Sequence, residues 1–281
     1  MRRRFINGSK ITFDYNDYMT IEALEDNVEI SLMRVSEYGI NGIGWTKYNN
    51  KIVVNSGDFV SIKDTLNKGE AYGSISINGK CNLRGNCNSL IFGDYASSHN
   101  DLSEYVNCFR GLLKDNSGVQ DVDSNFLPAT TLANSCYNSM FYNCTSLTAA
   151  PELPATTLAN YCYQYMFGGC TSLTQSPELP ATTLATWCYS DIFSGCTSLT
   201  TAPELPATTL ADYCYNSMFR NCTKLNYIKM LATDISAANC LSNWVNGVSS
   251  TGTFVKNPAM TSLPTGLNGI PSGWTVQNAT S

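Results

Sequence analysis

The sequence predicts an α+β protein in which an N-terminal, sandwich-like all-β module precedes a solenoid of 26-residue repeats and a short β cap. Three observations predict this class. The heptapeptide Leu-Pro-Ala-Thr-Thr-Leu-Ala occurs four times, each copy starting 26 residues after the last, and such a fixed period is typical of solenoids. Each copy carries apolar residues at helical spacing. Ahead of the array, short apolar or alternating segments lie between Asn, Gly and Asp turns, as in β-rich modules.

The N-terminal module is expected to span residues 1–95 and the tail residues 248–281. Short strands at close spacing in the module suggest a small sandwich or jelly roll. The tail contains two further strand-like segments on either side of a loop rich in Pro and Gly, and we expect it to cap the open end of the array. The predicted strands are residues 11–13, 28–32, 44–48, 51–54, 59–63 and 73–77 in the module and 252–255 and 273–276 in the tail.

The array is expected to cover residues 96–247 in about six turns, with full copies starting at Leu127, Leu153, Leu179 and Leu205. In the first full copy, apolar residues recur every four positions, which predicts an amphipathic helix over 132–144. Residues 146–150 predict a short strand, and the Pro-Glu-Leu-Pro segment after it predicts a stiff corner. A helix and a short strand every 26 residues predict a leucine-rich-repeat solenoid.

The end of each predicted helix carries the pattern Met-Phe-x-x-Cys-Thr-Ser-Leu-Thr, at residues 140–148, 166–174 and, with Ile192 in place of Met, 192–200. This pattern resembles the BspA-type leucine-rich repeat, a family of gut bacterial surface proteins and related phage proteins. The resemblance covers about half the chain. It implies a non-catalytic binding or adhesion role and carries no residue-level site. The Pro-Ala-Thr-Thr segment departs from the family, which usually has an apolar strand after the proline.

Composition argues against several functions. Lys and Arg number 17 and Asp and Glu 22, giving a net charge of −5, and only 14% of residues are charged. A nucleic-acid partner is not expected, because binding to phosphates needs a basic surface. His99 is the only histidine, and P-loop, G-x-S-x-G and H-E-x-x-H motifs do not occur. We therefore expect no catalytic residues, no cofactor and no metal, and we interpret the column of Glu152, Glu178 and Glu204 as solvated carboxylates rather than a Ca²⁺ site.

The basic run at the start of the chain is not followed by the apolar segment of a secretory signal peptide. No segment approaches the ~18 to 20 apolar residues that cross a bilayer, so no membrane span is expected. We interpret this as the native start of a protein kept in the cytoplasm until assembly or lysis; a trimmed signal with an added Met is the alternative. Arg2, Arg3 and Arg4 are candidate anchoring residues, with a solvated terminus as the alternative.

Nine of the twelve cysteines fall in two columns of the array. Equivalent residues on adjacent turns project in parallel about 4.8 Å apart, farther than the ~3.5–4.5 Å that separates Cβ atoms in a disulfide. Their spacing along the chain is also wrong for zinc. We therefore expect reduced, buried thiols in the array. Cys81 and Cys87, outside the array, could pair in an oxidising setting, and that alternative stays open.

Differences between copies indicate the candidate binding face, because repeats keep core positions fixed and vary exposed ones. One varying column reads Ser135 and then three aromatic residues, Tyr161, Trp187 and Tyr213. In a neighbouring column, Tyr165 stands where other copies have Ser or Asp. Exposed aromatic rows bind sugars or proteins, because rings supply a large contact area at low entropic cost. These four aromatic residues are the candidate ligand-binding site, and lateral packing between turns is the alternative.

Two functional hypotheses follow. The first is a phage virion component, of the capsid or a tail fibre, displayed on the virion surface. Its N-terminal module would anchor it to other virion proteins while the solenoid binds the host or a glycan. The second is a bacterial cell-surface adhesin that contacts other cell-surface components. Assembly as a homo-oligomer is expected by analogy with fibres alone.

Overall fold

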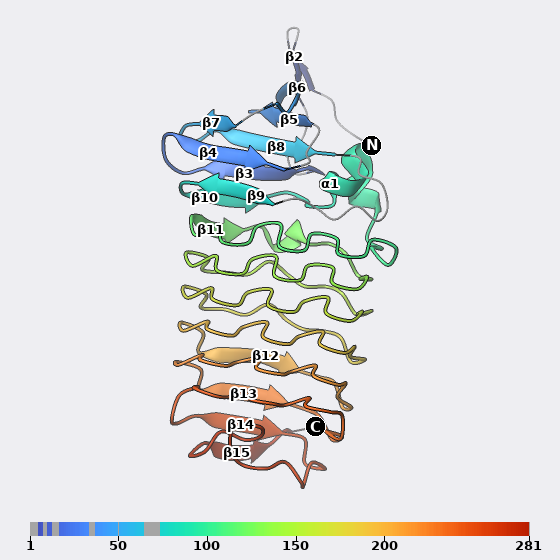
Figure 1. Ribbon diagram of the computed structural model, residues 1–281, viewed down its shortest axis with the longest axis vertical. Coiled ribbons are helices and arrows are strands. Elements are labelled where there is room, and N and C mark those ends of the chain that lie inside the picture. Colours follow the sequence, from blue (N-terminus) through green and yellow to red (C-terminus); the bar gives the residue numbers. More distant parts are fainter. Residues whose placement is uncertain are drawn as a thin grey trace.

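The computed structural model describes the backbone of residues 5–7 and 10–12, and all of residues 17–33, 37–49, 51–64 and 74–280. The described chain is mostly sheet with little helix. N-terminal strands lie at one end, and the rest of the chain continues from them as stacked turns along the long axis (Figure 1). The predicted solenoid is therefore confirmed at this level.

Two sheets form the N-terminal region. The larger has the order β1-β2-β6-β5-β8-β3-β10-β11, and its neighbours are antiparallel except for the parallel pair β10–β11. The smaller has the order β7-β4-β9 and is antiparallel. The strands of the larger sheet are β1 (Phe5–Asn7), β2 (Lys10–Thr12), β3 (Met19–Ala23), β5 (Glu37–Ile40), β6 (Ile43–Lys47), β8 (Phe59–Lys63), β10 (Cys81–Arg84) and β11 (Val119–Val122). Those of the smaller are β4 (Val28–Leu32), β7 (Ile52–Val54) and β9 (Ile75–Asn78).

Alternation in the sequence explains the best-predicted strands. Strand β4 buries Val28, Ile30 and Leu32 and exposes Ser31, as a half-buried strand should. The predicted strands 28–32 and 59–63 coincide with β4 and β8. Strands β3, β5 and β10 lie outside the predicted segments, because their short runs lack such clear alternation.

The predicted sandwich is not confirmed as a separate module. Strand β10 pairs with β3 on one side and with β11 on the other, so the larger sheet continues into the solenoid. Arg84 at the end of β10 joins Glu22 of β3 (3.0 Å) to Asp121 (2.6 Å) and Asp123 (3.2 Å). One buried apolar cluster also extends from Met19 through to Trp274. The N-terminal sheets and the solenoid therefore share a sheet and a core.

The short helices connect these parts. They are α1 (Ser89–Phe92) and two 3-10 helices, η2 (Gly93–Ser98) and η3 (Ser124–Phe126). Ser89 fixes α1 to the larger sheet, since its hydroxyl donates to the Ile62 carbonyl (3.0 Å) and accepts from the Met19 amide (2.9 Å).

Residues 132–144 do not form the predicted helix, nor do their equivalents in later copies. Instead, the amides of Cys136, Asn138 and Met140 each donate to the carbonyl three residues back at 3.2 Å, giving consecutive turns. Ser135 and Ser139 have φ angles of 57° and 56°, in the left-handed region that an α-helix does not admit. Their amides donate across to the next copy, at 2.9 and 2.8 Å. We call residues 133–144 and the equivalent 159–170, 185–196 and 211–222 the turn runs.

A four-stranded parallel sheet, β12-β13-β14-β15, covers the opposite side of the later turns. In the first full copy the predicted strand is reduced to a single bridge, between Ala149 and Gln175. Proline explains the difference, because it cannot donate to a ladder. Strand β12 contains Pro203 and its register against β13 shifts there, whereas β13 and β14 lack proline and pair without a break. These strands are β12 (Thr201–Leu205), β13 (Tyr227–Met230), β14 (Thr253–Lys256) and β15 (Thr275–Asn278).

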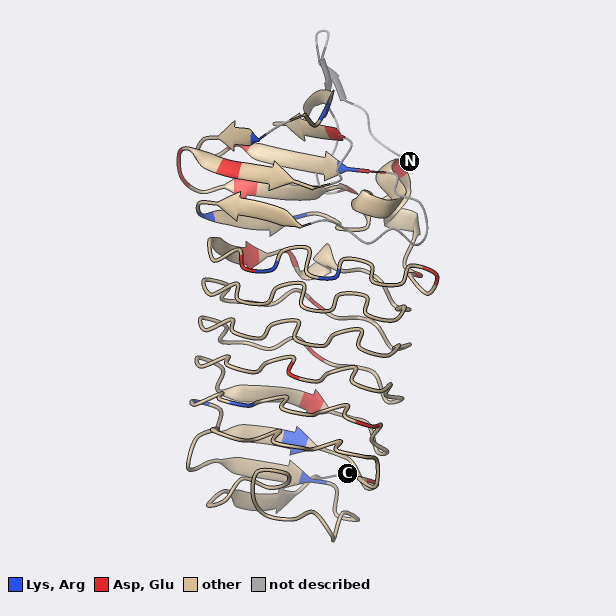
Figure 2. Ribbon diagram, viewed as in Figure 1, with Lys and Arg blue, Asp and Glu red and all other residues tan. Residues whose placement is uncertain are grey.

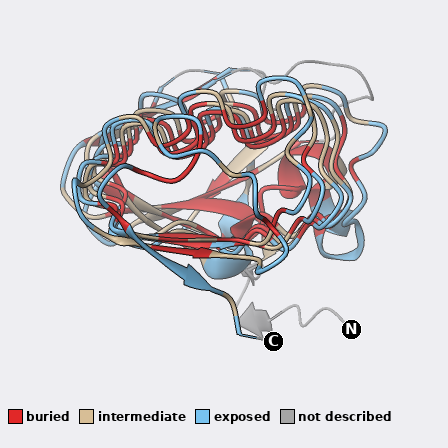
Figure 3. Ribbon diagram, turned by 90° about the horizontal axis from the view of Figure 1, so that it is seen from below, coloured by how far each residue is buried: buried red, intermediate tan, exposed pale blue. Residues whose placement is uncertain are grey.

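The solenoid core is a set of aromatic stacks between these two sides. Seen end-on, the turn runs lie along one side and the strands along the other, and both sides contain stretches of buried backbone (Figure 3). The Tyr137 column stacks at 5.8–6.3 Å between ring centroids, and the Phe141 column at 5.7–5.9 Å. Each such pair contributes about 0.5–1.5 kcal/mol beyond its burial. The core therefore holds successive turns in one register.

The two strands predicted in the tail are present as β14 and β15, and they extend the sheet in parallel. Trp244 and Trp274 pack under them. Their indole N–H groups donate to the carbonyls of Gly269 and Ser249, both at 2.8 Å. The tail thus covers the core of the last turn.

Candidate functional site

Three of the four predicted aromatic residues form one stack on the outer surface of the turn runs. The rings of Tyr161 and Trp187 are 6.2 Å apart with 13° between their planes, and those of Trp187 and Tyr213 are 4.1 Å apart at 6°. Tyr161 is 39% exposed, and the other two are half-buried. We call these three residues the aromatic ladder.

Every residue of the aromatic ladder has a left-handed backbone. The φ angles are 61° for Tyr161, 59° for Trp187 and 56° for Tyr213. Such a backbone costs an L-residue roughly 1–2 kcal/mol and is unusual for a bulky one. At both ends of the same column the chain has Asn, which tolerates this conformation better than most residues other than glycine, in Asn107 and Asn239. Phe109 and Tyr137 share this conformation in the buried core, with φ of 58° and 63°, so it is the combination of strain with exposure in three consecutive copies that favours a binding role.

Tyr165 lies in a second left-handed column, with φ of 56°, and contacts a different ring. Its ring meets Tyr142 edge-to-face, 6.2 Å away at 85°. On the next turn Asp191 is buried and accepts a hydrogen bond from Ser190 Oγ at 2.8 Å. Burial raises the pKa of the Asp191 carboxyl, and burial together with the Asp191 charge raises the pKa of Tyr165. Tyr165 therefore flanks the aromatic ladder without joining its stack.

Two asparagines beside the ladder are part of the site, although the sequence did not point to them. Asn134 Oδ1 accepts from the Asn160 amide, and Asn160 Oδ1 accepts from the Thr186 amide, both at 3.2 Å. These bonds fix each carboxamide with its oxygen against the next turn. Within the described chain the two Nδ2 groups have no protein partner, so they can donate to a ligand. A polar residue at this position in every copy was the available signal.

The cysteines are structural. All twelve are free and buried, Cys81 and Cys87 included. The thiols of Cys170, Cys196 and Cys222 donate to carbonyls on the preceding turn at 3.0–3.1 Å. Burial raises the pKa of Cys170 and Cys222 to about 12. These cysteines therefore act as neutral donors that tie adjacent turns together.

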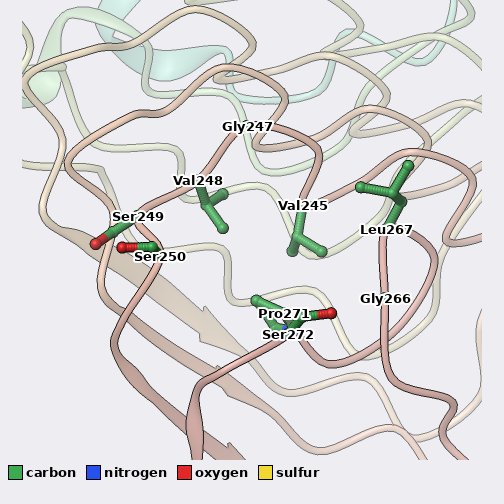
Figure 4. Close-up of a pocket in the computed structure, with 9 residues that line it drawn as sticks. All are labelled: Val245, Gly247, Val248, Ser249, Ser250, Gly266, Leu267, Pro271 and Ser272. Carbon is green, nitrogen blue, oxygen red and sulfur yellow. The ribbon is translucent and has the colours of Figure 1, made fainter.

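Two hollows lie away from the ladder. One, of about 520 Å³, is bordered by prolines and by Glu152 and Glu178. The other, of about 240 Å³, lies near the C-terminal end and is lined by Val245, Val248 and Leu267 together with serines, glycines and a proline (Figure 4). The second has no titratable side chain in its lining. Neither hollow includes a residue of the aromatic ladder.

Charge is sparse around the ladder. Figure 2 shows few charged residues over the middle turns of the solenoid. The third residue of the glutamate column, Glu204, pairs with Lys229 at 2.9 Å. Among the described residues, no group of three or more His, Cys, Asp or Glu side chains is arranged to hold a metal ion. The predicted anchoring residues Arg2, Arg3 and Arg4 lie outside the described residues.

Comparisons with protein-family models, with curated proteins and with solved structures find no match to this chain. In the described part of the chain, no helix has the length and apolar character needed to span a membrane. The function is therefore inferred from the geometry of the turn runs.

Proposed function

We propose that the protein is a non-enzymatic surface protein. The turn runs of its solenoid would be the face that binds a ligand. The observation that carries this proposal is the aromatic ladder. Its three rings occupy positions where aromatic residues are strained, and they lie at an exposed face. The buried columns keep nearly the same residue in each copy, whereas Ser135 and Tyr161 show how the exposed column changes. A purely structural column would instead be expected to keep the unstrained residues found at its ends.

We further propose that this binding protein is a phage virion component, of the capsid or a tail fibre, located on the virion surface. The resemblance of the repeat to BspA-type proteins supports this proposal, as does the β-rich region ahead of the array, which would anchor the solenoid to other virion proteins. A bacterial cell-surface leucine-rich-repeat adhesin is the alternative. Peptide mass spectrometry on purified phage particles and on washed envelopes from one infected culture separates the two. Enrichment in envelopes would contradict the virion assignment.

The binding role is tested by replacing Tyr161 and Trp187 together with alanine. Labelled protein is added to intact gut anaerobes, and bound label is measured by flow cytometry. The double variant should lose binding while its thermal midpoint stays within a few degrees of the original. Tyr95→Ala is the matched control, because Tyr95 is 68% exposed but lies in η2, outside the turn runs. Unchanged binding would refute the proposal, and a large loss of stability would show that the two rings serve packing instead.

A further inference from the structure

We infer that the ligand of the aromatic ladder is a neutral carbohydrate, one of whose sugar rings stacks on the free face of Tyr161. This inference rests on the proposed function and adds the ligand class and the point of contact. It depends on three features of the turn runs: which ring faces are open, which hydrogen-bond donors lie beside them, and how little charge surrounds them.

The ladder leaves ring faces open at its two ends, on Tyr161 and on Tyr213. At the Tyr213 end the flanking side chain is the Asp212 carboxylate, which accepts from the Ala238 amide at 2.8 Å and offers a ligand no donor. Trp187 is stacked on both sides, by Tyr161 and by Tyr213. Both faces of its ring are therefore covered, and a ligand can contact only the edge of the ring. Tyr161 is covered by Trp187 on one face. On its other side the same column of the preceding turn holds Ser135, and among the described residues no other ring contacts Tyr161. Adjacent turns are about 4.8 Å apart, which leaves room for one further ring beside Tyr161, at the position of Ser135. We call this position the missing rung.

The donors beside this position are already oriented. Asn134 precedes Ser135 in the chain, and Asn160 precedes Tyr161, so the two carboxamides flank the missing rung on successive turns. Their oxygens accept backbone amides at 3.2 Å, which leaves each Nδ2 to donate outward. A donor that is fixed before binding loses little conformational entropy when the ligand arrives. A pyranose ring matches this arrangement, because it offers an apolar C–H face to the tyrosine and hydroxyl oxygens to the amides.

The surroundings favour a neutral ligand. Between Ser124 and Ser190 the only charged residues are Glu152 and Glu178, both exposed and both in the proline corners rather than in the turn runs. Lys and Arg are absent from that stretch. Phosphate, sulfate or carboxylate groups would therefore find no cation in that stretch. The turn preceding Ser135 adds only Arg110 and Lys114, and Lys114 lies over the Tyr142 ring at 5.2 Å, whereas binding of nucleic acid needs several cations.

The test fills the missing rung. Ser135→Tyr places a ring over the free face of Tyr161, in a backbone conformation that tyrosine already adopts at position 161. Asn239→Tyr is the matched control. Asn239 is the same column at the far end of the ladder, next to Tyr213, with φ of 52°. The labelled full chain and both variants are applied to an array of neutral glucans, mannans, galactans and N-acetylglucosamine oligomers together with sialylated and sulfated glycans.

The original protein should bind neutral glycans on the array. Ser135→Tyr should weaken that binding at least tenfold, and Asn239→Tyr should change it less than twofold, with both variants unfolding at the original midpoint. Absence of glycan binding, binding confined to the acidic glycans, or undiminished binding by Ser135→Tyr would overturn the inference.

Cell binding, measured in parallel, separates this inference from the proposed function. Periodate cleaves the vicinal diols of surface sugars and should abolish binding of the original protein to cells. If cell binding survives periodate and is lost in the ladder double variant, the proposed function stands, the carbohydrate inference fails and the ligand is a protein. If the original protein binds no cells, the proposed function itself fails.

Discussion

Replacing Ser135 by glycine should give a more stable protein than replacing it by alanine. Ser135 has φ of 57°, a conformation that costs an L-residue roughly 1–2 kcal/mol relative to glycine. The greater freedom of glycine in the unfolded chain offsets about 0.5–1 kcal/mol of this gain. Taking the middle of each range, the net preference for glycine is about 0.75 kcal/mol. In the helix predicted from sequence spacing, alanine would instead be preferred by about 1 kcal/mol.

Which of the two variants is more stable, Ser135→Gly or Ser135→Ala, distinguishes a left-handed backbone at position 135 from a helical one. Urea unfolding followed by circular dichroism measures it, and the thermal midpoints of the two variants should differ by roughly 1–4 °C. Ser194 is the control, because it is also half-exposed in a turn run but is not one of the left-handed residues. At that position alanine should be at least as stable as glycine. A Ser135→Ala protein more stable than Ser135→Gly would refute the left-handed backbone and restore the helix.

Three further predictions concern the core, the joined sheets and the thiols. Tyr163→Phe should leave the free energy of unfolding unchanged or raise it by up to about 1 kcal/mol, because the buried hydroxyl has no hydrogen-bond partner in the described chain. A decrease of more than about 1 kcal/mol, measured by urea unfolding, would contradict this. Arg84→Met should lower the free energy of unfolding by about 1–2 kcal/mol, because three carboxylates lose their partner at a partly exposed site. Arg84→Lys should recover part of that loss. Equal stability of the two variants would count against a stabilising role for the Arg84 ion pairs. Finally, stability should fall as pH rises from about 9 to 12. Burial raises the pKa of five thiols to about 12 in the folded protein, whereas unfolded thiols ionise near pH 8.5. The contribution of these thiols to the free energy of unfolding is complete below the thiol pKa of the unfolded chain and is lost as the pH approaches the thiol pKa of the folded protein. Equal urea midpoints at pH 8 and pH 10.5 would disprove this prediction.

The period of the repeat was sufficient to predict a solenoid, but not the conformation of its turns. Apolar residues recur every four positions both in a helix and in the turn runs, where a left-handed residue recurs every four positions and directs Cys136 and Met140 inward. A signal for the second interpretation was present. Glycine stands at position 169 and again at 247, and Asn143 at the same column, and these residues are typical of positive φ. Apolar spacing alone therefore cannot separate the two conformations.

The column of the candidate site could be predicted from the sequence, but the stacking of its rings and the open face of Tyr161 could not. The differences between copies located Tyr161, Trp187 and Tyr213. Whether their rings stack depends on the rise between turns and on the direction of each side chain, neither of which is encoded locally. The orientation of Asn134 likewise depends on an amide 26 residues away. Features that arise between turns need the three-dimensional register.

The hydrogen bonds between successive turns have a mechanical consequence. They run along the axis of the solenoid on the turn-run side and, where strands form, within the parallel sheet, so a pull along that axis loads them one turn after another. Each released turn frees 26 residues, which span roughly 86–94 Å when extended but occupy about 4.8 Å in the stack. Under load the chain would lengthen in equal steps and absorb work at each one, so it can serve as an extensible tether between its two ends.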